Sequence, residues 1–330
     1  MKFQKIFCIF LACLCLAGCG DATPAETLPA TTAPMETAPP VTALEAEAPP
    51  AEFAVLAEPT PMAEAMVLTP EASGTAEERC ADAVIDYSHA EDGYVMARFL
   101  TETQSRLKVL IKGPTTTYSY NLPLDQWAVF PLSDGSGNYQ VCVYQNICDS
   151  KYALVLSAVF DVALTDEFAP FLRPNQYVDY TAATKAVEKG LDITAGLSHP
   201  LEKVAAVYDF VVTHLEYDYE KAATVKSGYL PVLDAVLNAK KGICFDYAAL
   251  MTAMLRSQGI PSKLVVGYAG TTYHAWISVW TEENGWVDGA IFFDGHIWKR
   301  MDPTFASSGN RSDEIMDYIE HGDYIAKYLY

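Results

Sequence analysis

The stretch GICFDYAALMTAMLRSQGIP, residues 242–261, has the pattern of a helix that starts at a cysteine. Apolar side chains recur in it at helical spacing and predict a buried face: Ala248, Met251, Met254 and Leu255. Gly259 and Pro261 supply the stop signal at its end. Cys244 would therefore stand at the helix N-terminus, where the backbone N–H groups and the helix dipole favour a thiolate. A small apolar residue for packing would suit the same place, so position alone leaves both interpretations open.

A nucleophilic thiolate needs a histidine within hydrogen-bond reach, and the chain has six. Only His274 begins an apolar strand, HAWISVW, of the kind expected beside a central helix. The other histidines lie near turns, in polar stretches or on an earlier helix: His89, His199, His214, His296 and His321. His274 is the predicted partner of the cysteine, and His89, among acidic neighbours, is interpreted as a solvated turn residue.

A catalytic histidine also needs a carboxylate or amide that fixes its orientation. Asp302 begins the motif Asp-Pro-Thr, where the proline stiffens the chain and holds the carboxylate in a defined place. Asp288 and Asp294 each precede a glycine, in pairs that are typical of turns. Asp302 is therefore favoured, and Asp288 is its first substitute.

These motifs together resemble the core of the transglutaminase-like superfamily of papain-type cysteine enzymes. The resemblance rests on GICFDYA at 242–248, RSQGIP at 256–261, HAW at 274–276 and DPT at 302–304. The three key residues follow in the expected order, 30 residues apart (274 minus 244) and 28 apart (302 minus 274). The similarity covers about 180–305 and implies that Cys244 is the nucleophile, His274 the general base and later acid, and Asp302 the orienting carboxylate. The long stretch 285–300 departs from compact members of the family, and we expect an extra hairpin there.

The resemblance implies acyl transfer from an amide or peptide carbonyl through a thioester on Cys244. The backbone N–H of Cys244 is the expected oxyanion donor at the helix start. Tyr217 and Tyr219 are expected to pack in the core, with a substrate or oxyanion role as the alternative. Hydrolysis is favoured because it needs no second substrate site. A cross-linking transglutaminase and a non-catalytic cell-surface binding or assembly module with this fold remain the alternatives.

The hydrophobic pattern of the chain changes near residue 170, from short alternating runs to helical spacing, which predicts an α+β protein with two domains. Residues 79–170 show six to eight short alternating runs and predict an antiparallel, Ig-like β-sandwich. Residues 171–330 predict a transglutaminase-like catalytic domain with helices first and strands second. Helices are expected from Pro200 and over 231–240, and extended segments over 263–268, 274–280 and 286–301. Residues 282–285 are expected to turn a hairpin between the last two segments.

The N-terminal region predicts export and anchoring. Residues 1–19 combine Lys2 and Lys5 with a short apolar run, as in an export signal, and end in Leu-Ala-Gly-Cys, which resembles a lipobox with Cys19 as the lipidated residue. Residues 20–78 hold ten prolines and eleven acidic residues without Lys or Arg, which favours a disordered stalk. We therefore expect a lipid anchor on the extracytoplasmic face of the cell membrane, and a protein or cell-wall peptide substrate at the cell surface.

Charge and motif content exclude several functions. The chain has a net charge of −20, and residues 79–330 alone carry 20 basic and 31 acidic residues, which argues against nucleic acid as a partner. The sequence has no phosphate-binding loop, no dinucleotide fingerprint, no HExxH and no CxxC, so no cofactor or metal is expected. Three further cysteines of the body could form one disulfide or remain free thiols: Cys80, Cys142 and Cys148.

Overall fold

The computed structural model describes residues 64–288, 291–293, 298–300 and 324–330. Every described residue belongs to one compact unit. The predicted signal with Cys19, and most of the predicted stalk, therefore lie outside the described residues. In the part that is described, no helix is long and apolar enough to cross a membrane.

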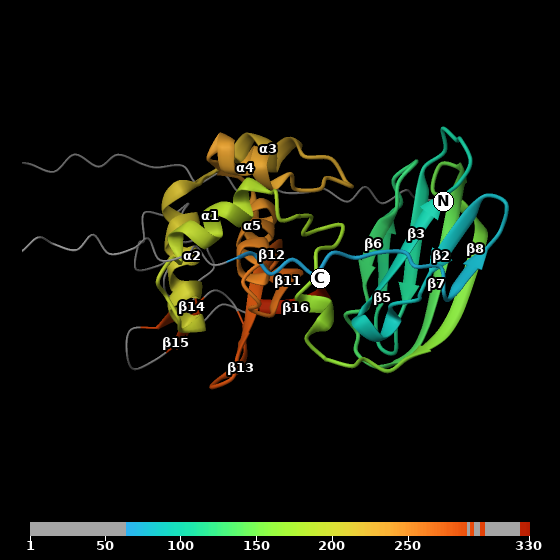
Figure 1. Cartoon of the computed structure of the whole chain (residues 1–330). Coiled ribbons are helices and arrows are strands. Elements are labelled where there is room, and N and C mark those ends of the chain that lie inside the picture. Colours follow the sequence, from blue (N-terminus) through green and yellow to red (C-terminus); the bar gives the residue numbers. More distant parts are fainter. Residues whose placement is uncertain (1–63, 289–290, 294–297, 301–323) are drawn as a thin grey trace, which may run out of the picture. The chain divides into compact units, whose positions relative to one another are not determined.

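The first half of the unit is a β-sandwich of two four-stranded sheets (Figure 1). One sheet has the order β1-β2-β3-β6, formed by Glu77–Arg79, Ala83–Asp86, Tyr94–Phe99 and Ala128–Pro131. The other has the order β5-β4-β7-β8, formed by Thr117–Asn121, Leu107–Lys112, Gly137–Cys148 and Lys151–Val162. All neighbouring strands pair antiparallel, as the sequence predicted. Two short 3-10 helices, Ala90–Asp92 and Ala169–Phe171, complete this half.

Alternation along the strands decides which side chains fill the sandwich. In β4, Leu107, Val109 and Ile111 are buried, whereas the residues between them are half-buried. Phe130 of β6 and Val141 of β7 are fully buried in the same apolar core, so that core draws on both sheets. Period-two patterning explains β4 and β5, whereas all residues of β2 and most of those of β3 are buried.

Residues 64–78, which composition assigned to the stalk, pack on the folded unit. Met66 N–H donates to Ser257 O at 2.8 Å, and Gly74 N–H donates to Asp86 Oδ2 at 2.6 Å. β1 then pairs with β2 through backbone hydrogen bonds. Composition underestimates the order of this segment because backbone pairing to a neighbouring strand requires few apolar side chains.

In its described residues, the second half contains five α-helices and a third four-stranded antiparallel sheet (Figure 1). The helices α1 to α5 are Lys185–Ile193, Pro200–His214, Tyr219–Thr224, Leu233–Ala239 and Cys244–Arg256. The sheet has the order β13-β12-β11-β16, formed by Gly285–Asp288, Thr272–Thr281, Ser262–Ala269 and Tyr324–Leu329. The short strands β9 and β10, Glu216–Tyr217 and Lys241–Gly242, pair parallel. The strands β14 and β15, Ile291–Phe293 and Trp298–Arg300, form the expected extra hairpin.

Helix α5 is the centre of this half. It contacts β11 and β12 on one side and α1 and α2 on others, and all residues from Asp246 to Arg256 are buried. Gly190 of α1 allows the closest approach, since an added Cβ would lie 3.1 Å from Met254 Cβ. The predicted start at Cys244 and the predicted buried face are confirmed, and burial extends further: helices and sheet together cover the whole helix after its first two residues.

The remaining differences from the predicted elements are local. Helix α4 begins at Leu233 and not at Pro231. The turn after β12 agrees with the prediction, because it leads into β13 with Thr281 opposite Gly285. Helices α1 and α3 and strand β16 were not predicted. Contacts also join the two halves into one unit, for example Gln176 Nε2, which donates to Asn121 O at 2.7 Å.

Candidate active site

Strand pairing places Cys244 at the start of α5. Glu216 N–H donates to Lys240 O at 2.9 Å and Asp218 N–H donates to Gly242 O at 2.8 Å, so β9 fixes the chain just before the helix. Gly242 is required there, because an added Cβ would lie 2.8 Å from Asp246 Cβ. Cys244 is the first helical residue and is half-buried. Asp246 N–H already donates to Ile243 O at 2.8 Å, whereas the N–H groups of Cys244 and Phe245 precede the first hydrogen bonds of the helix and can face an anion.

His274 lies on the sheet that packs against α5. It is the third residue of β12, pairs with Gly267 of β11, and is 5% exposed. Its ring is nearly parallel to that of Trp276, with centroids 6.4 Å apart. Gly267 lets β16 come close to this point, since a Cβ there would lie within 3.0 Å of both Trp276 and Ala326.

Cys244 and His274 line one cavity of about 490 Å³. Much of the wall is aromatic and comes from separate segments of the chain: Tyr177, Tyr217, Tyr229, Tyr273 and Tyr330. The loop 225–230 forms a further part of the wall. The structure thus brings together two of the three predicted catalytic side chains in a site large enough for a peptide side chain or a short peptide segment.

A buried charge cluster supports the start of α5. Asp246 is fully buried and accepts hydrogen bonds from Lys221 Nζ at 2.6 Å and from Tyr229 OH at 2.5 Å. It also accepts from Ile243 N–H at 2.8 Å, which satisfies one of the unpaired donors of the helix N-terminus. The ammonium of Lys221 lies 4.2 Å from the centre of the Tyr229 ring. Asp246 is therefore neutralised by Lys221 and does not act as an uncompensated charge behind the thiol.

The cavity tyrosines are held in their neutral form. Burial raises the pKa of Tyr177 to about 12, and burial and Asp246 together raise the pKa of Tyr229 above its ordinary value. Burial, followed by the neighbouring tyrosines, also raises the pKa of Tyr330. At neutral pH these groups are phenols and add no negative charge to the cavity, and the proton of Tyr229 OH is donated to Asp246.

The other predicted residues have different outcomes. Asp302 and Asp294 lie outside the described residues, and Asp288 is the last residue of β13, opposite Ser278. Tyr217 is half-buried and lines the cavity. The expectation of core packing is wrong for Tyr219, which is 66% exposed and contacts Tyr217 edge to face at 4.9 Å between ring centres.

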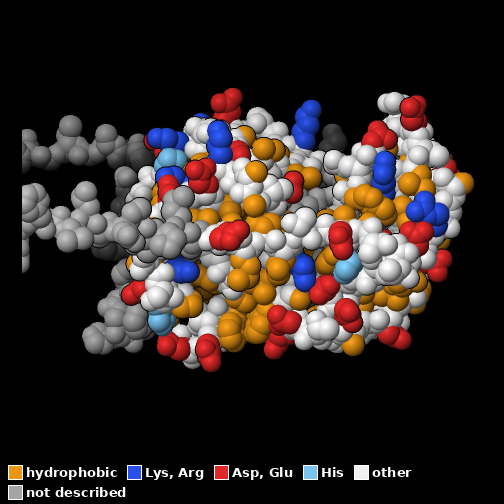
Figure 2. Space-filling view, viewed as in Figure 1, with side chains coloured by type: hydrophobic (Ala, Val, Ile, Leu, Met, Phe, Trp, Pro, Cys, Tyr) orange, Lys and Arg blue, Asp and Glu red, His pale blue; other side chains and the backbone are white. Residues whose placement is uncertain are grey.

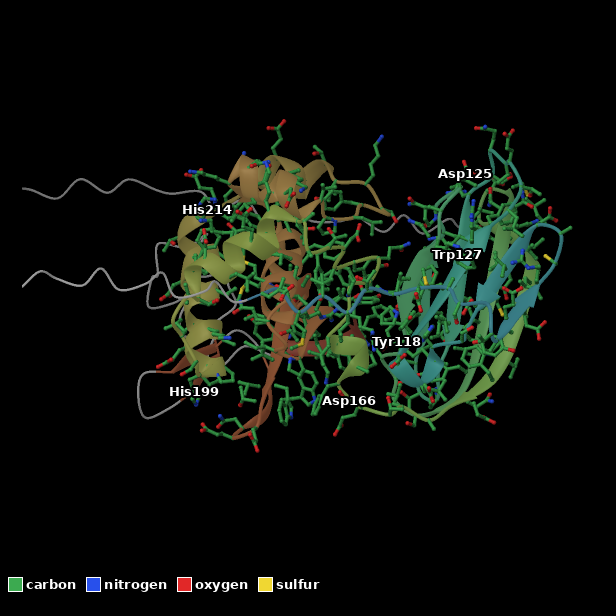
Figure 3. All side chains as sticks on the ribbon, viewed as in Figure 1. Tyr118, Asp125, Trp127, Asp166, His199 and His214 are labelled. Atoms are coloured by element: carbon green, nitrogen blue, oxygen red, sulfur yellow. The ribbon has the colours of Figure 1, made fainter. Side chains whose placement is uncertain are left out.

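Among the described residues, the other histidines and cysteines do not line this cavity, and His296 and His321 lie outside the described part of the chain. His199 and His214 mark the two ends of α2 (Figure 3), and His89 Nδ1 lies 3.1 Å from Asp92. Cys80, Cys142 and Cys148 are free thiols, as is Cys244. Across the described parts of the chain, no three His, Cys, Asp or Glu side chains are grouped so that they could hold a metal ion.

Sequence reasoning missed most of the cavity wall. Tyr273 stands next to His274 and could have been found by that adjacency. Tyr177, Tyr229 and Tyr330 reach the cavity from distant segments and had no local signal. Lys221 also had no local signal, because its role depends on Asp246, which lies 25 residues further along the chain.

A cysteine at a helix start that shares a cavity with a strand histidine is the arrangement of a cysteine acyl-transfer site. Residues 188–289 match the family model of the transglutaminase-like superfamily. The chain therefore carries a transglutaminase-like domain, and the matched segment includes Cys244 and His274 but ends before Asp302.

Several known proteins are similar to this chain. An uncharacterized protein of Mycobacterium leprae is 33% identical over 137 residues, which are 38% of this chain and 46% of that protein. A protein-glutamine gamma-glutamyltransferase of Pseudomonas aeruginosa is 27% identical over 121 residues, 32% of this chain and 16% of that protein. The kyphoscoliosis peptidase of Mus musculus is 29% identical over 143 residues, 41% of this chain and 21% of that protein. The chain thus spans less than half the length of each of these relatives.

Among solved structures, a candidate cysteine protease from Cytophaga hutchinsonii is similar over 77% of this chain and 73% of its own. The sequence identity is 14% and the TM-score is 0.36.

Proposed function

We propose that this protein is a cysteine acyl-transfer enzyme that attacks amide or peptide carbonyls, with Cys244 as the nucleophile and His274 as the general base. The observation that carries the proposal is that both side chains line one cavity, with the cysteine at the start of a buried helix. A helix N-terminus stabilises negative charge, which favours the reactive form of the thiol.

In this mechanism His274 takes the thiol proton and the sulfur of Cys244 adds to the carbonyl carbon. The backbone N–H groups of the first turn of α5 stabilise the oxyanion that forms. The carbon–nitrogen bond then breaks, and the amine leaves with a proton from the imidazolium. Water, deprotonated by His274, attacks the thioester, which releases a carboxylic acid and restores the thiol.

Asp302 is proposed as the group that orients His274, with Asp288 as its substitute. The support is the order of the motifs and the proline after Asp302. The test is a pair of substitutions, Asp302→Asn and Asp288→Asn. The first should lower kcat/KM by about 10²- to 10⁴-fold and the second by no more than a few fold. The reverse pattern would assign the role to Asp288.

Hydrolysis is the favoured reaction because it needs only one substrate site, and transfer to an amine is the alternative. One relative is named a protein-glutamine gamma-glutamyltransferase, which is consistent with transfer. Another is named a peptidase, which is consistent with hydrolysis. A binding module without turnover is less well supported, since such a module gains nothing from a cysteine and a histidine in one cavity.

We also propose that the protein acts on proteins or cell-wall peptides at the extracytoplasmic face of the membrane, held by a lipid on Cys19. The support is the leader sequence and its Leu-Ala-Gly-Cys ending. Labelled fatty acid should be incorporated in cells that express the full chain. Equal incorporation in Cys19→Ala would contradict the anchor.

The activity itself is tested by mass spectrometry of peptide mixtures incubated with the enzyme, with and without an added primary amine. Wild-type protein should give cleaved or deamidated peptides, whereas Cys244→Ala should give none. Joined peptides or amine adducts would instead favour transfer. Cys148→Ser, which removes an exposed thiol, is the matched control and should behave as wild type. Identical products from wild type and Cys244→Ala would refute the proposal.

A further inference from the structure

The loop 225–230, which walls the cavity beside Cys244, carries a lysine. We infer that the cavity binds amide substrates that carry a free carboxylate close to the attacked amide, and that Lys226 selects them. The inference rests on the proposed function, because it names the substrate class of the same site.

The charge around the cavity differs from that of the chain as a whole. The chain has 42 acidic and 22 basic residues, and acidic side chains are spread over the face drawn in Figure 2. None of the described residues that line the cavity is Asp or Glu. The polar wall consists mainly of neutral groups, such as the tyrosines, Asn121 and Ser227. Lys226 is the one side chain with a permanent charge among the described residues of that wall.

The neighbouring lysines are already neutralised. Lys221 Nζ lies 2.6 Å from Asp246 Oδ2, and Lys241 Nζ lies 3.5 Å from Asp218 Oδ1. In the part of the chain that the structure describes, Lys226 has no such ion pair. Glu216 of β9 and Glu220 of α3 lie on nearby elements but do not line the cavity. One positive charge is therefore left uncompensated at the site.

The loop that carries Lys226 is anchored on both sides of the cavity. Tyr229 N–H donates to Lys226 O at 3.2 Å, and Tyr229 OH donates to Asp246 at 2.5 Å. Gly228 has φ of +89° and packs on the sandwich, since an added Cβ would lie 2.5 Å from Asn121 Nδ2. The backbone of Lys226 is thus held at the wall, and its exposed side chain lines the cavity together with Cys244.

The cavity is small enough for the charge of Lys226 to act across it. A round cavity of about 490 Å³ would be about 10 Å across, which is about one Debye length at 0.1 M salt. An ammonium group attracts a carboxylate over this distance and does not discriminate among neutral groups. The site therefore favours an anionic substrate over its neutral carboxamide counterpart.

Two alkylating reagents of matched size test this directly. Iodoacetate and iodoacetamide both form a carbon–sulfur bond with loss of iodide, but only iodoacetate carries a carboxylate. Rates at Cys244 are read by mass spectrometry of the tryptic peptide 242–256, which contains no other cysteine. In the intact protein at low salt, Lys226→Met should lower the iodoacetate-to-iodoacetamide rate ratio by about two- to fivefold, as expected for one charge at this distance.

Matched variants make the result specific. Lys226→Arg keeps the charge and should keep the ratio. Lys151→Met removes one charge from an exposed position on β8 and should leave both rates unchanged. The difference between wild type and Lys226→Met should also shrink in about 0.5 M salt, because the interaction is screened.

The outcomes separate the two proposals. A Cys244 that reacts with neither reagent would overturn the proposed function and the inference with it. A Cys244 that reacts with both, at a ratio that Lys226→Met does not change, would overturn the role of Lys226 and leave the nucleophile in place.

Discussion

The two halves of the folded unit fill their interiors with different chemistry. In the sandwich, fully buried positions such as Val109, Phe130 and Val141 are apolar. In the second half, the central helix buries Asp246 and Arg256 without any exposure. A buried charge is costly unless it is paired and hydrogen-bonded, so it persists only where its partners are fixed in place. The contrast indicates that directed bonds fix the two ends of the helix that begins at Cys244, in addition to the apolar packing around it.

The two charged residues of α5 fix its two ends. Asp246 is bonded to Lys221 and Tyr229 near the start of the helix. Arg256 closes the last turn and donates to three backbone carbonyls, those of Ser262 at 2.8 Å, Arg173 at 2.7 Å and Tyr330 at 2.6 Å. Burial lowers the pKa of Arg256 to about 10, so it remains charged at neutral pH.

The largest stability effect that this comparison predicts is at Arg256. Arg256→Met should lower the free energy of unfolding by about 3–5 kcal/mol, because it leaves buried carbonyls without donors. Arg79→Met in β1 removes an exposed arginine paired with Glu77 and should have little effect on the free energy of unfolding. Urea unfolding of both variants measures the difference. Equal losses would mean that directed bonds matter no more in the helical half than in the sandwich.

A smaller effect on the free energy of unfolding is expected at high pH, in both halves of the folded unit. Burial raises the pKa of Tyr118 in the sandwich and of Tyr177 at the cavity, each from 10.0 to about 12. Between these values the unfolded chain loses the proton and the folded protein keeps it. Stability is therefore complete below pH 10 and falls as pH rises towards 12, by at most about 1.4 kcal/mol per pH unit for each group.

Urea unfolding at pH 9, 10 and 11 checks this slope. Tyr118→Phe and Tyr177→Phe should each make the loss of stability above pH 10 less steep than in wild type. Slopes that neither substitution alters would show that these phenols do not titrate differently in the folded protein.

The smallest effect is expected on the outer face of the sandwich. Leu154 of β8 is 55% exposed and lies opposite Tyr144, so Leu154→Gln should change the free energy of unfolding by less than about 0.5 kcal/mol. The fully buried Leu250→Ala in α5 should cost about 2–5 kcal/mol in the same assay. A large loss at Leu154 would reveal packing on this face that the folded unit itself does not provide.

The parts of the fold that follow from local pattern were predictable from the sequence. Alternation marked the sandwich strands, and helical spacing with a cysteine start and a Gly-Ile-Pro stop marked α5. The placement of Cys244 and His274 on the wall of one cavity was also predictable, because a helix tends to pack against the strand hairpin that follows it.

The parts that depend on distant partners were not predictable. β16 joins the sheet beside β11 from more than 50 residues further along the chain, and nothing in 324–329 specifies that neighbour. Asp246 could be recognised as a first-turn acid, but its neutralisation requires Lys221 on another helix. The cavity tyrosines converge only because the fold brings their segments together, so their role has no local signal.

The central claim is that Cys244 is a nucleophile activated by His274. The most direct measurement is the rate at which a neutral thiol reagent labels the peptide 242–256 at pH 7 in wild type, His274→Ala and His214→Ala. Labelling should be at least about tenfold slower in His274→Ala, because the thiol loses its base. It should be unchanged in His214→Ala, because His214 lies at the end of α2 and does not line the cavity. Equal labelling of wild type and His274→Ala would contradict the central claim.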